Sequence, residues 1–191
     1  KDRLKTLQPY ISPVDNKETF ENDVVTTLVK GAYNCLYIGS LRGGAKELNL
    51  TSNKLHDLLS VDENEEPVLC RNLLVASDNE LWIGAESGIY IYNLRMGKYV
   101  HLRSSINDPY SLSDNAIYSL CKDREGGIWI GSYFGGVNYY PRFHTYFEKY
   151  YPKGTNNGLH GKRVREFCQD NQGILWIGTE DGGLNRFDPK T

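Results

Sequence analysis

The sequence Ile128-Trp129-Ile130-Gly131 decides the fold, because the chain repeats it at a fixed interval. The same motif stands at Leu81-Trp82-Ile83-Gly84 and at Leu175-Trp176-Ile177-Gly178, so that the three tryptophans are spaced 47 residues apart. A fourth copy, Leu36-Tyr37-Ile38-Gly39, lies 45 residues before the first tryptophan copy and has Tyr in place of Trp. Self-similarity at a period of this length indicates a repeat architecture.

Each copy carries two further positions in the same phase. A glycine follows the aromatic residue by six positions, and the four glycines are Gly43, Gly88, Gly135 and Gly182. An apolar residue precedes the aromatic by twelve positions and opens a short apolar run; these residues are Val25, Cys70, Ile117 and Val164. Agreement at three offsets predicts that each period is one structural unit.

The third copy shows the strands most clearly. We expect strands at 117–122, 128–132, 137–140 and 146–150, separated by the turn 123–127 and by a second turn at 134–136. The composition agrees, since 14 Tyr and 19 Gly against a single Met favour short strands joined by glycine turns. Four strands in about 47 residues is the size of a β-propeller blade. The sequence therefore predicts an all-β chain of four blades, each a four-stranded antiparallel sheet.

The repeated aromatic residues are expected between neighbouring blades. A thin sheet exposes two faces, and stacking between neighbours is what buries both of them. Burial of a large aromatic ring contributes roughly 2–3 kcal/mol, so we interpret the repeated aromatics as core rather than as a surface for ligand stacking. The predicted inter-blade core residues are Tyr37, Trp82, Trp129 and Trp176.

The 191 residues divide in this interpretation into one partial propeller, 1–191. Residues 1–23 hold the fourth strand of a preceding blade, at Leu4–Leu7, and a loop; the blades follow at 24–67, 68–115, 116–162 and, incomplete, 163–191. Two arrangements stay open: a closed ring of four blades in which both ends share a sheet, or an arc of a larger propeller. We favour the arc, whose open blade edges would permit self-association.

Charge and motif spacing exclude several classes of function. With 22 Lys and Arg against 24 Asp and Glu, and no basic face, nucleic acid is not an expected partner. No apolar run approaches the 18 residues of a membrane span. The four cysteines form no CxxC pair and have no histidine nearby at metal-ligand spacing. We therefore predict neither a metal site nor a cofactor.

Catalysis is not predicted either. Glu166 is the only carboxylate on the predicted innermost strands, whereas a glycosidase needs a pair of carboxylates at a set separation. No Ser-His-Asp constellation can be assembled from the spacing. We keep a propeller glycosidase or lyase only as a third functional hypothesis, after the two that are described below.

The strings 123–131 (DREGGIWIG) and 170–189 (DNQGILWIGTEDGGLNRFDP), with the lead-in 107–115 (NDPYSLSDN), resemble the two-component regulator propeller repeat. The resemblance implies the periplasmic sensor region of a Bacteroides-type hybrid two-component histidine kinase, part of an inner-membrane protein. It further implies a kinase and more propeller blades as partners within the same protein, an oligosaccharide as ligand, and no chemistry performed by the propeller itself.

A binding face can be chosen from propeller geometry. The turn between the second and third strands of each blade opens on the same face as the connection to the next blade, and ligands usually meet that face. The predicted binding residues in these turns are Arg42, Glu86, Tyr133, Phe134, Glu180 and Asp181. Aromatic faces with charged groups suit a sugar or a uronic acid. The alternatives are simple solvent exposure of these residues, and a non-catalytic scaffold for protein–protein interaction.

Overall fold

The structure, a computed structural model, describes residues 10, 20, 22–142, 150–152 and 158–190. This part of the chain contains fourteen β-strands and no helix, and hence no helix that could cross a membrane. The chain divides into two compact units, Lys1–His144 and Thr145–Thr191. The all-β prediction is confirmed.

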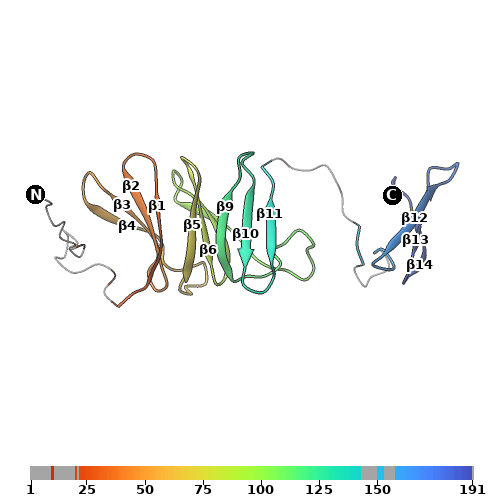
Figure 1. Ribbon diagram of the computed structural model, residues 1–191, viewed down its shortest axis with the longest axis horizontal. Coiled ribbons are helices and arrows are strands. Elements are labelled where there is room, and N and C mark those ends of the chain that lie inside the picture. The colour runs from red at the N-terminus through yellow and green to blue at the C-terminus, as the bar shows by residue number, and fades with distance from the viewer. Residues whose placement is uncertain (1–9, 11–19, 21, 143–149, 153–157, 191) are drawn as a thin grey trace, which may run out of the picture. The chain divides into compact units, whose positions relative to one another are not determined.

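The first unit contains three antiparallel sheets that stand side by side (Figure 1). Sheet 1 is formed by β1 (Val25–Lys30), β2 (Cys35–Ser40), β3 (Gly44–Asn49) and β4 (Lys54–Leu59). Sheet 2 is formed by β5 (Cys70–Ser77), β6 (Glu80–Ala85), β7 (Gly88–Asn93) and β8 (Lys98–Leu102). Sheet 3 is formed by β9 (Ile117–Lys122), β10 (Ile128–Ser132) and β11 (Val137–Tyr140).

The second unit contains one sheet, sheet 4, which is formed by β12 (Val164–Gln169), β13 (Leu175–Thr179) and β14 (Gly183–Phe187). All four sheets are meanders in which consecutive strands pair, as a propeller blade requires. The strands predicted at 117–122, 128–132 and 137–140 coincide with β9, β10 and β11. The strands predicted at 4–7 and 146–150 fall outside the described residues, apart from Tyr150, which lies in no strand.

The aspartate that precedes the repeated motif closes a turn and anchors the tryptophan. In sheet 4, Oδ1 of Asp170 accepts the backbone N–H of Ile174 at 3.0 Å, and Oδ2 accepts the indole N–H of Trp176 at 2.9 Å. In sheet 3, Asp123 likewise accepts the backbone N–H of Gly127 with Oδ1 and the indole N–H of Trp129 with Oδ2. The strings DREGG and DNQG are therefore structural, since one carboxylate fixes both the turn and the ring.

The sheets of the first unit pack through two apolar layers. Between sheets 1 and 2 the layer is formed by Tyr37, Ala45, Leu59, Val68, Cys70, Leu73, Leu81, Ile83, Ala85, Tyr90 and Tyr92. Between sheets 2 and 3 it is formed by Ala76, Trp82, Ile89, Leu112, Ile117, Ile128 and Ile130. The innermost strands β1, β5 and β9 are neighbours in this stack. Burial on both faces is what makes each thin sheet stable.

The glycine of the repeated motif allows neighbouring sheets to approach closely. A Cβ at Gly39 would lie 2.6 Å from Sγ of Cys70 in sheet 2, and a Cβ at Gly84 would lie 2.9 Å from Cγ2 of Ile117 in sheet 3. Both distances are below any real Cβ contact. In these two copies the motif ends in glycine because the innermost strand of the next sheet fills the space of a side chain.

The repeated aromatics differ in burial. Tyr37 and Trp82 are 5% and 1% exposed, in the layers that face the following sheet, and Trp82 meets Tyr140 of sheet 3 edge-on. Ile128 and Ile130 face sheet 2, so the alternation of side chains along β10 directs Trp129 to the other face of sheet 3, where it is 47% exposed within the described residues. Trp176 is half-buried.

Candidate functional site

A β-bulge recurs in the innermost strand of every sheet. Between the first two strands of each sheet, the register skips one residue of the innermost strand. The skipped residues are Thr26, Arg71, Tyr118 and Arg165. A bulge bends the strand and redirects a side chain, and bulges are common beside binding sites.

The turn after the second strand is attached directly beside this bulge. Its first residue donates a backbone N–H to the carbonyl two residues before the bulged residue, at distances of 2.9 to 3.2 Å in the four sheets. These turn residues are Leu41, Glu86, Tyr133 and Glu180. The repeat therefore places at this turn of each sheet one pair of side chains outside the apolar layers: 26 with 41, 71 with 86, 118 with 133, and 165 with 180.

In sheet 2 this pair is an ion pair. Nε and Nη2 of Arg71 lie 2.6 and 2.5 Å from Oε1 of Glu86, and both side chains are about 30% exposed, at 31% and 30%. The guanidinium of Arg71 also lies over the ring of Tyr118 in sheet 3, at 4.9 Å from its centroid. The hydroxyl of Tyr118 donates to Oε1 of Glu86 at 3.3 Å. The bulged positions of two sheets are thereby joined by a cation–π contact and a hydrogen bond.

An aromatic surface continues from this ion pair. The rings of Tyr118 and Tyr133 are 5.1 Å apart, and Phe134 meets Tyr133 edge-on at 4.3 Å. Tyr133 and Phe134 are 58% and 85% exposed. Asp114 fixes this turn by accepting the backbone N–H of Phe134 at 2.9 Å, and this hydrogen bond is the main cause that lowers the pKa of Asp114.

We call Arg71, Glu86, Tyr118, Tyr133 and Phe134 the bulge cluster. Three of its members, Glu86, Tyr133 and Phe134, are predicted from the sequence, and the structure brings them together. Arg71 and Tyr118 are not predicted. A signal for them exists, because both occupy the second position of an innermost strand, and that position is 47 residues apart in the two repeats.

Arg42 is placed differently. Its backbone N–H donates to Oδ1 of Asp23 at 2.9 Å, and its side chain is exposed in the turn of sheet 1. Among the described residues, no contact of its side chain with the bulge cluster is found. The bulged residue of sheet 1, Thr26, uses its hydroxyl structurally and donates to the carbonyl of Cys70 at 2.8 Å.

The remaining predicted residues, Glu180 and Asp181, lie in the second unit. Glu180 pairs with Arg165, and its Oε2 lies 3.8 Å from Nη1 of Arg163. Asp181 is used by its own turn, since Oδ1 accepts the backbone N–H of Lys162 at 2.9 Å. The pair of Arg165 and Glu180 occupies the repeat positions of Arg71 and Glu86, two periods of 47 residues later.

The bulge cluster offers groups suited to binding. Exposed ring faces can stack on apolar C–H faces of a ligand, while the guanidinium donates and the carboxylate accepts hydrogen bonds. Because Arg71 and Glu86 hold each other, both polar groups are orientated before a ligand arrives, which lowers the entropic cost of binding.

Two segments of the chain, 111–134 and 158–181, match the family described as two component regulator propeller. No curated protein matches the chain. Among solved structures, the chain is similar to the extracellular domain of the putative hybrid two component system BT3049 from B. thetaiotaomicron, with 28% identity and a TM-score of 0.54. The match covers 86% of this chain and 21% of that chain.

The extracellular domain of the putative hybrid two component system BT4673 from B. thetaiotaomicron shares the fold, with 22% identity and a TM-score of 0.56. It is matched over 87% of this chain and 22% of that chain. The chain thus spans about a fifth of the length of these neighbours.

Proposed function

Because the chain carries two-component regulator propeller repeats, we propose that it is the ligand-sensing part of an extracytoplasmic propeller in a hybrid two-component system. The solved neighbours support this proposal, since both are extracellular domains of putative systems of that kind. Further blades and a histidine kinase of the same protein are then its partners, and the chain itself binds without catalysing a reaction.

The ligand that we propose is an oligosaccharide, and the bulge cluster is its site. The observation that carries this proposal is the continuous series of side-chain contacts from sheet 2 to sheet 3 that joins Arg71, Glu86, Tyr118, Tyr133 and Phe134. Pyranose rings present an apolar C–H face and a rim of hydroxyls, which match exposed aromatic rings beside fixed donors and acceptors. A uronic acid would in addition place a carboxylate near the guanidinium of Arg71.

The test is titration calorimetry of the chain against a panel of neutral and uronic-acid oligosaccharides. For a ligand that binds, we expect Tyr133→Ala and Arg71→Ala each to weaken the affinity at least about tenfold, which corresponds to about 1.4 kcal/mol. Loss of Arg71 should weaken an acidic ligand more than a neutral one, because a charge-assisted hydrogen bond is lost.

Matched controls exist at the opposite end of the sheets. Tyr33 in the β1–β2 turn is 86% exposed, and Arg95 in the β7–β8 turn is exposed, so Tyr33→Ala and Arg95→Ala remove the same side chains from the other face. These two variants should bind like the unaltered chain. Equal weakening by a control and by its counterpart, or unaltered affinity in both cluster variants, would remove the bulge cluster as the site.

A further inference from the structure

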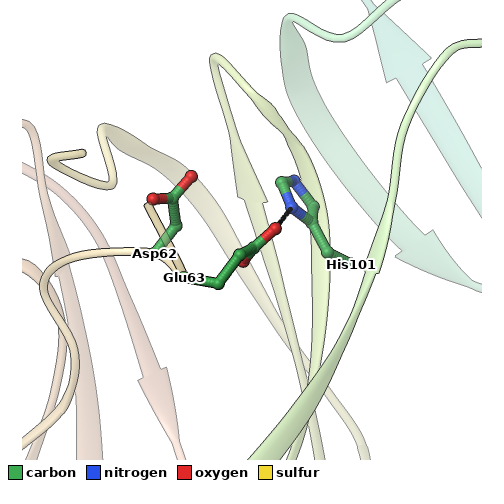
Figure 2. Close-up of side chains that lie close together, drawn as sticks. All are labelled: Asp62, Glu63 and His101. Atoms are coloured by element: carbon green, nitrogen blue, oxygen red, sulfur yellow. Dashed lines mark hydrogen bonds and ion pairs between the residues drawn. The ribbon is translucent and has the colours of Figure 1, made fainter. Parts of the chain in front are cut away.

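A second group of polar side chains lies where the connection between sheets 1 and 2 meets the edge strand of sheet 2. Asp62 and Glu63 belong to the connection, and His101 belongs to β8 (Figure 2). One ligand atom from each of the three lies within 4.8 Å of the others. The figure shows the carboxylate of Glu63 directed at the ring of His101.

The surroundings of His101 fix which ring nitrogen carries a proton. Nε2 lies 3.0 Å from the carbonyl oxygen of Ser87, and a carbonyl oxygen can only accept a hydrogen bond. Nε2 must therefore carry a proton, which leaves Nδ1 as the ring nitrogen that can bind a metal ion. The ring cannot turn freely, because it stacks on Tyr90 at 3.9 Å and its side chain is only 7% exposed.

Nδ1 of His101 points into the cluster. Among the described residues, its polar neighbour is Oε1 of Glu63 at 3.4 Å, and no partner for it lies outside the cluster. Without a metal, a proton on Nδ1 joins these two atoms as an ion pair, and a divalent cation bound between them would take the place of that proton. The convergence of a largely buried imidazole and two carboxylates is the observation that points to a metal ion here.

The distance between these atoms fits a shared metal ion. Two ligands bound at about 2.0–2.1 Å with a tetrahedral angle are separated by about 3.3–3.4 Å. A direct N–H···O hydrogen bond is shorter, usually about 2.7–3.2 Å. The separation of 3.4 Å between Nδ1 and Oε1 is long for a hydrogen bond and matches the edge of a tetrahedral metal site.

The hydrogen bonds around the three candidate ligands are of the kind that usually orientate metal ligands. A metal-binding histidine usually donates its second N–H to a carbonyl or carboxylate, as His101 does to Ser87. Glu63 is orientated by Tyr99, whose hydroxyl donates to Oε2 at 2.9 Å. Asp62 is fixed because its Oδ1 accepts the backbone N–H groups of Asn64 and Glu66 at 2.8 and 3.1 Å.

We propose that Asp62, Glu63 and His101 bind a divalent first-row transition metal, with Zn²⁺ as the reference ion. Imidazole nitrogen with carboxylate oxygens suits Zn²⁺, whereas Ca²⁺ and Mg²⁺ prefer oxygen ligands only. The metal would connect the 60–67 loop to the edge strand of sheet 2, and water would fill the rest of its coordination sphere.

The test uses zinc chloride added to chelator-treated chain in which the exposed Cys121 and Cys168 are replaced by Ser, because thiolates bind zinc by themselves. Calorimetry should show one zinc ion per chain. Glu63→Gln should weaken binding at least about tenfold, while Glu66→Gln, an exposed acid of the same loop outside the cluster, should leave it unaltered.

Imidazole ¹⁵N spectra give a second readout that needs no substitution at His101, whose ring is packed on Tyr90. We expect a proton on Nε2 both before and after zinc is added, and a shift of the Nδ1 signal with zinc but not with magnesium. The proposal is overturned if no zinc binds, if Glu66→Gln weakens binding as much as Glu63→Gln, or if the Nδ1 signal does not respond.

Discussion

The indole N–H of Trp176 donates a hydrogen bond to Oδ2 of Asp170 at 2.9 Å. This bond, followed by backbone N–H groups of the same turn, holds the pKa of Asp170 below its ordinary value of 3.8. The contact joins the turn of the repeat to its most characteristic side chain, and it has a consequence for stability in acid.

Sheet 4 should lose stability in acid through Asp170. Its folded-state pKa is lower than its unfolded value, so its contribution is present above the ordinary pKa of 3.8 and is lost as the pH falls through the folded value. In Asp170→Asn the acid dependence of unfolding should be weaker. Urea unfolding at a series of pH values, followed by the indole NMR signal of Trp176, measures how the unfolding free energy changes with pH. Asp188→Asn in the same unit is the control and should behave like the unaltered chain. An unaltered acid dependence in Asp170→Asn would contradict the expectation.

Trp82 should be the most costly aromatic to remove from the first unit. It is 1% exposed between sheets 2 and 3, so Trp82→Ala leaves a cavity and should destabilise the fold by about 3–5 kcal/mol. Ile106 is 98% exposed, and Ile106→Ala should alter stability by no more than about 0.5 kcal/mol. Urea unfolding followed by circular dichroism compares the two; similar losses would show that the indole is not core.

The four thiols should separate into two classes. Cys121 and Cys168 are exposed and should react rapidly with a thiol reagent, whereas Cys35 and Cys70 are buried and should react only after unfolding. Mass spectrometry of the modified chain at increasing reagent exposure identifies the order. Early modification of Cys70 would contradict the packing between sheets 1 and 2.

Alkaline pH should weaken the same layer. Burial raises the pKa of Cys70 from 9.0 to about 12. Between these values the unfolded thiol ionises while the folded one stays protonated, so the contribution is complete below pH 9.0 and is lost as the pH rises toward about 12. The unfolding free energy of Cys70→Ala should therefore fall less steeply above pH 9.0 than that of the unaltered chain. Cys121→Ala serves as the exposed control.

The ion pair of Arg71 and Glu86 should contribute little to folding. Both side chains are about one-third exposed, at 31% and 30%, and pairs that solvent screens in this way contribute about 0.2–1 kcal/mol. A double-mutant cycle with Arg71→Ala and Glu86→Ala, read by urea unfolding, measures the coupling. A coupling well above this range would mean that the pair serves the fold, and a loss of ligand in Arg71→Ala could then not be assigned to recognition.

The sequence predicted strands well because every strand of the third copy is bounded by a glycine turn and repeats at 47 residues. The bulge was not predictable in this way, because the period gives the position of Arg71 but not the register at which β5 pairs with β6. The contact of His101 with Glu63 could not be predicted for another reason. His101 is 38 residues from Glu63 in the sequence, and only the return of the loop onto β8 brings the two together.

The skipped position in each innermost strand also separates what the chain recognises from how it folds. Thr26, Arg71, Tyr118 and Arg165 differ in size, charge and polarity, yet the ladders on either side of them are the same. Arg71, Tyr118 and Arg165 lie outside the apolar layers, so a substitution at these three positions should leave strand pairing in place. Copies of one architecture can therefore acquire different specificities by changing a few of these positions, and a library randomised at them alone should yield folded variants with new ligands.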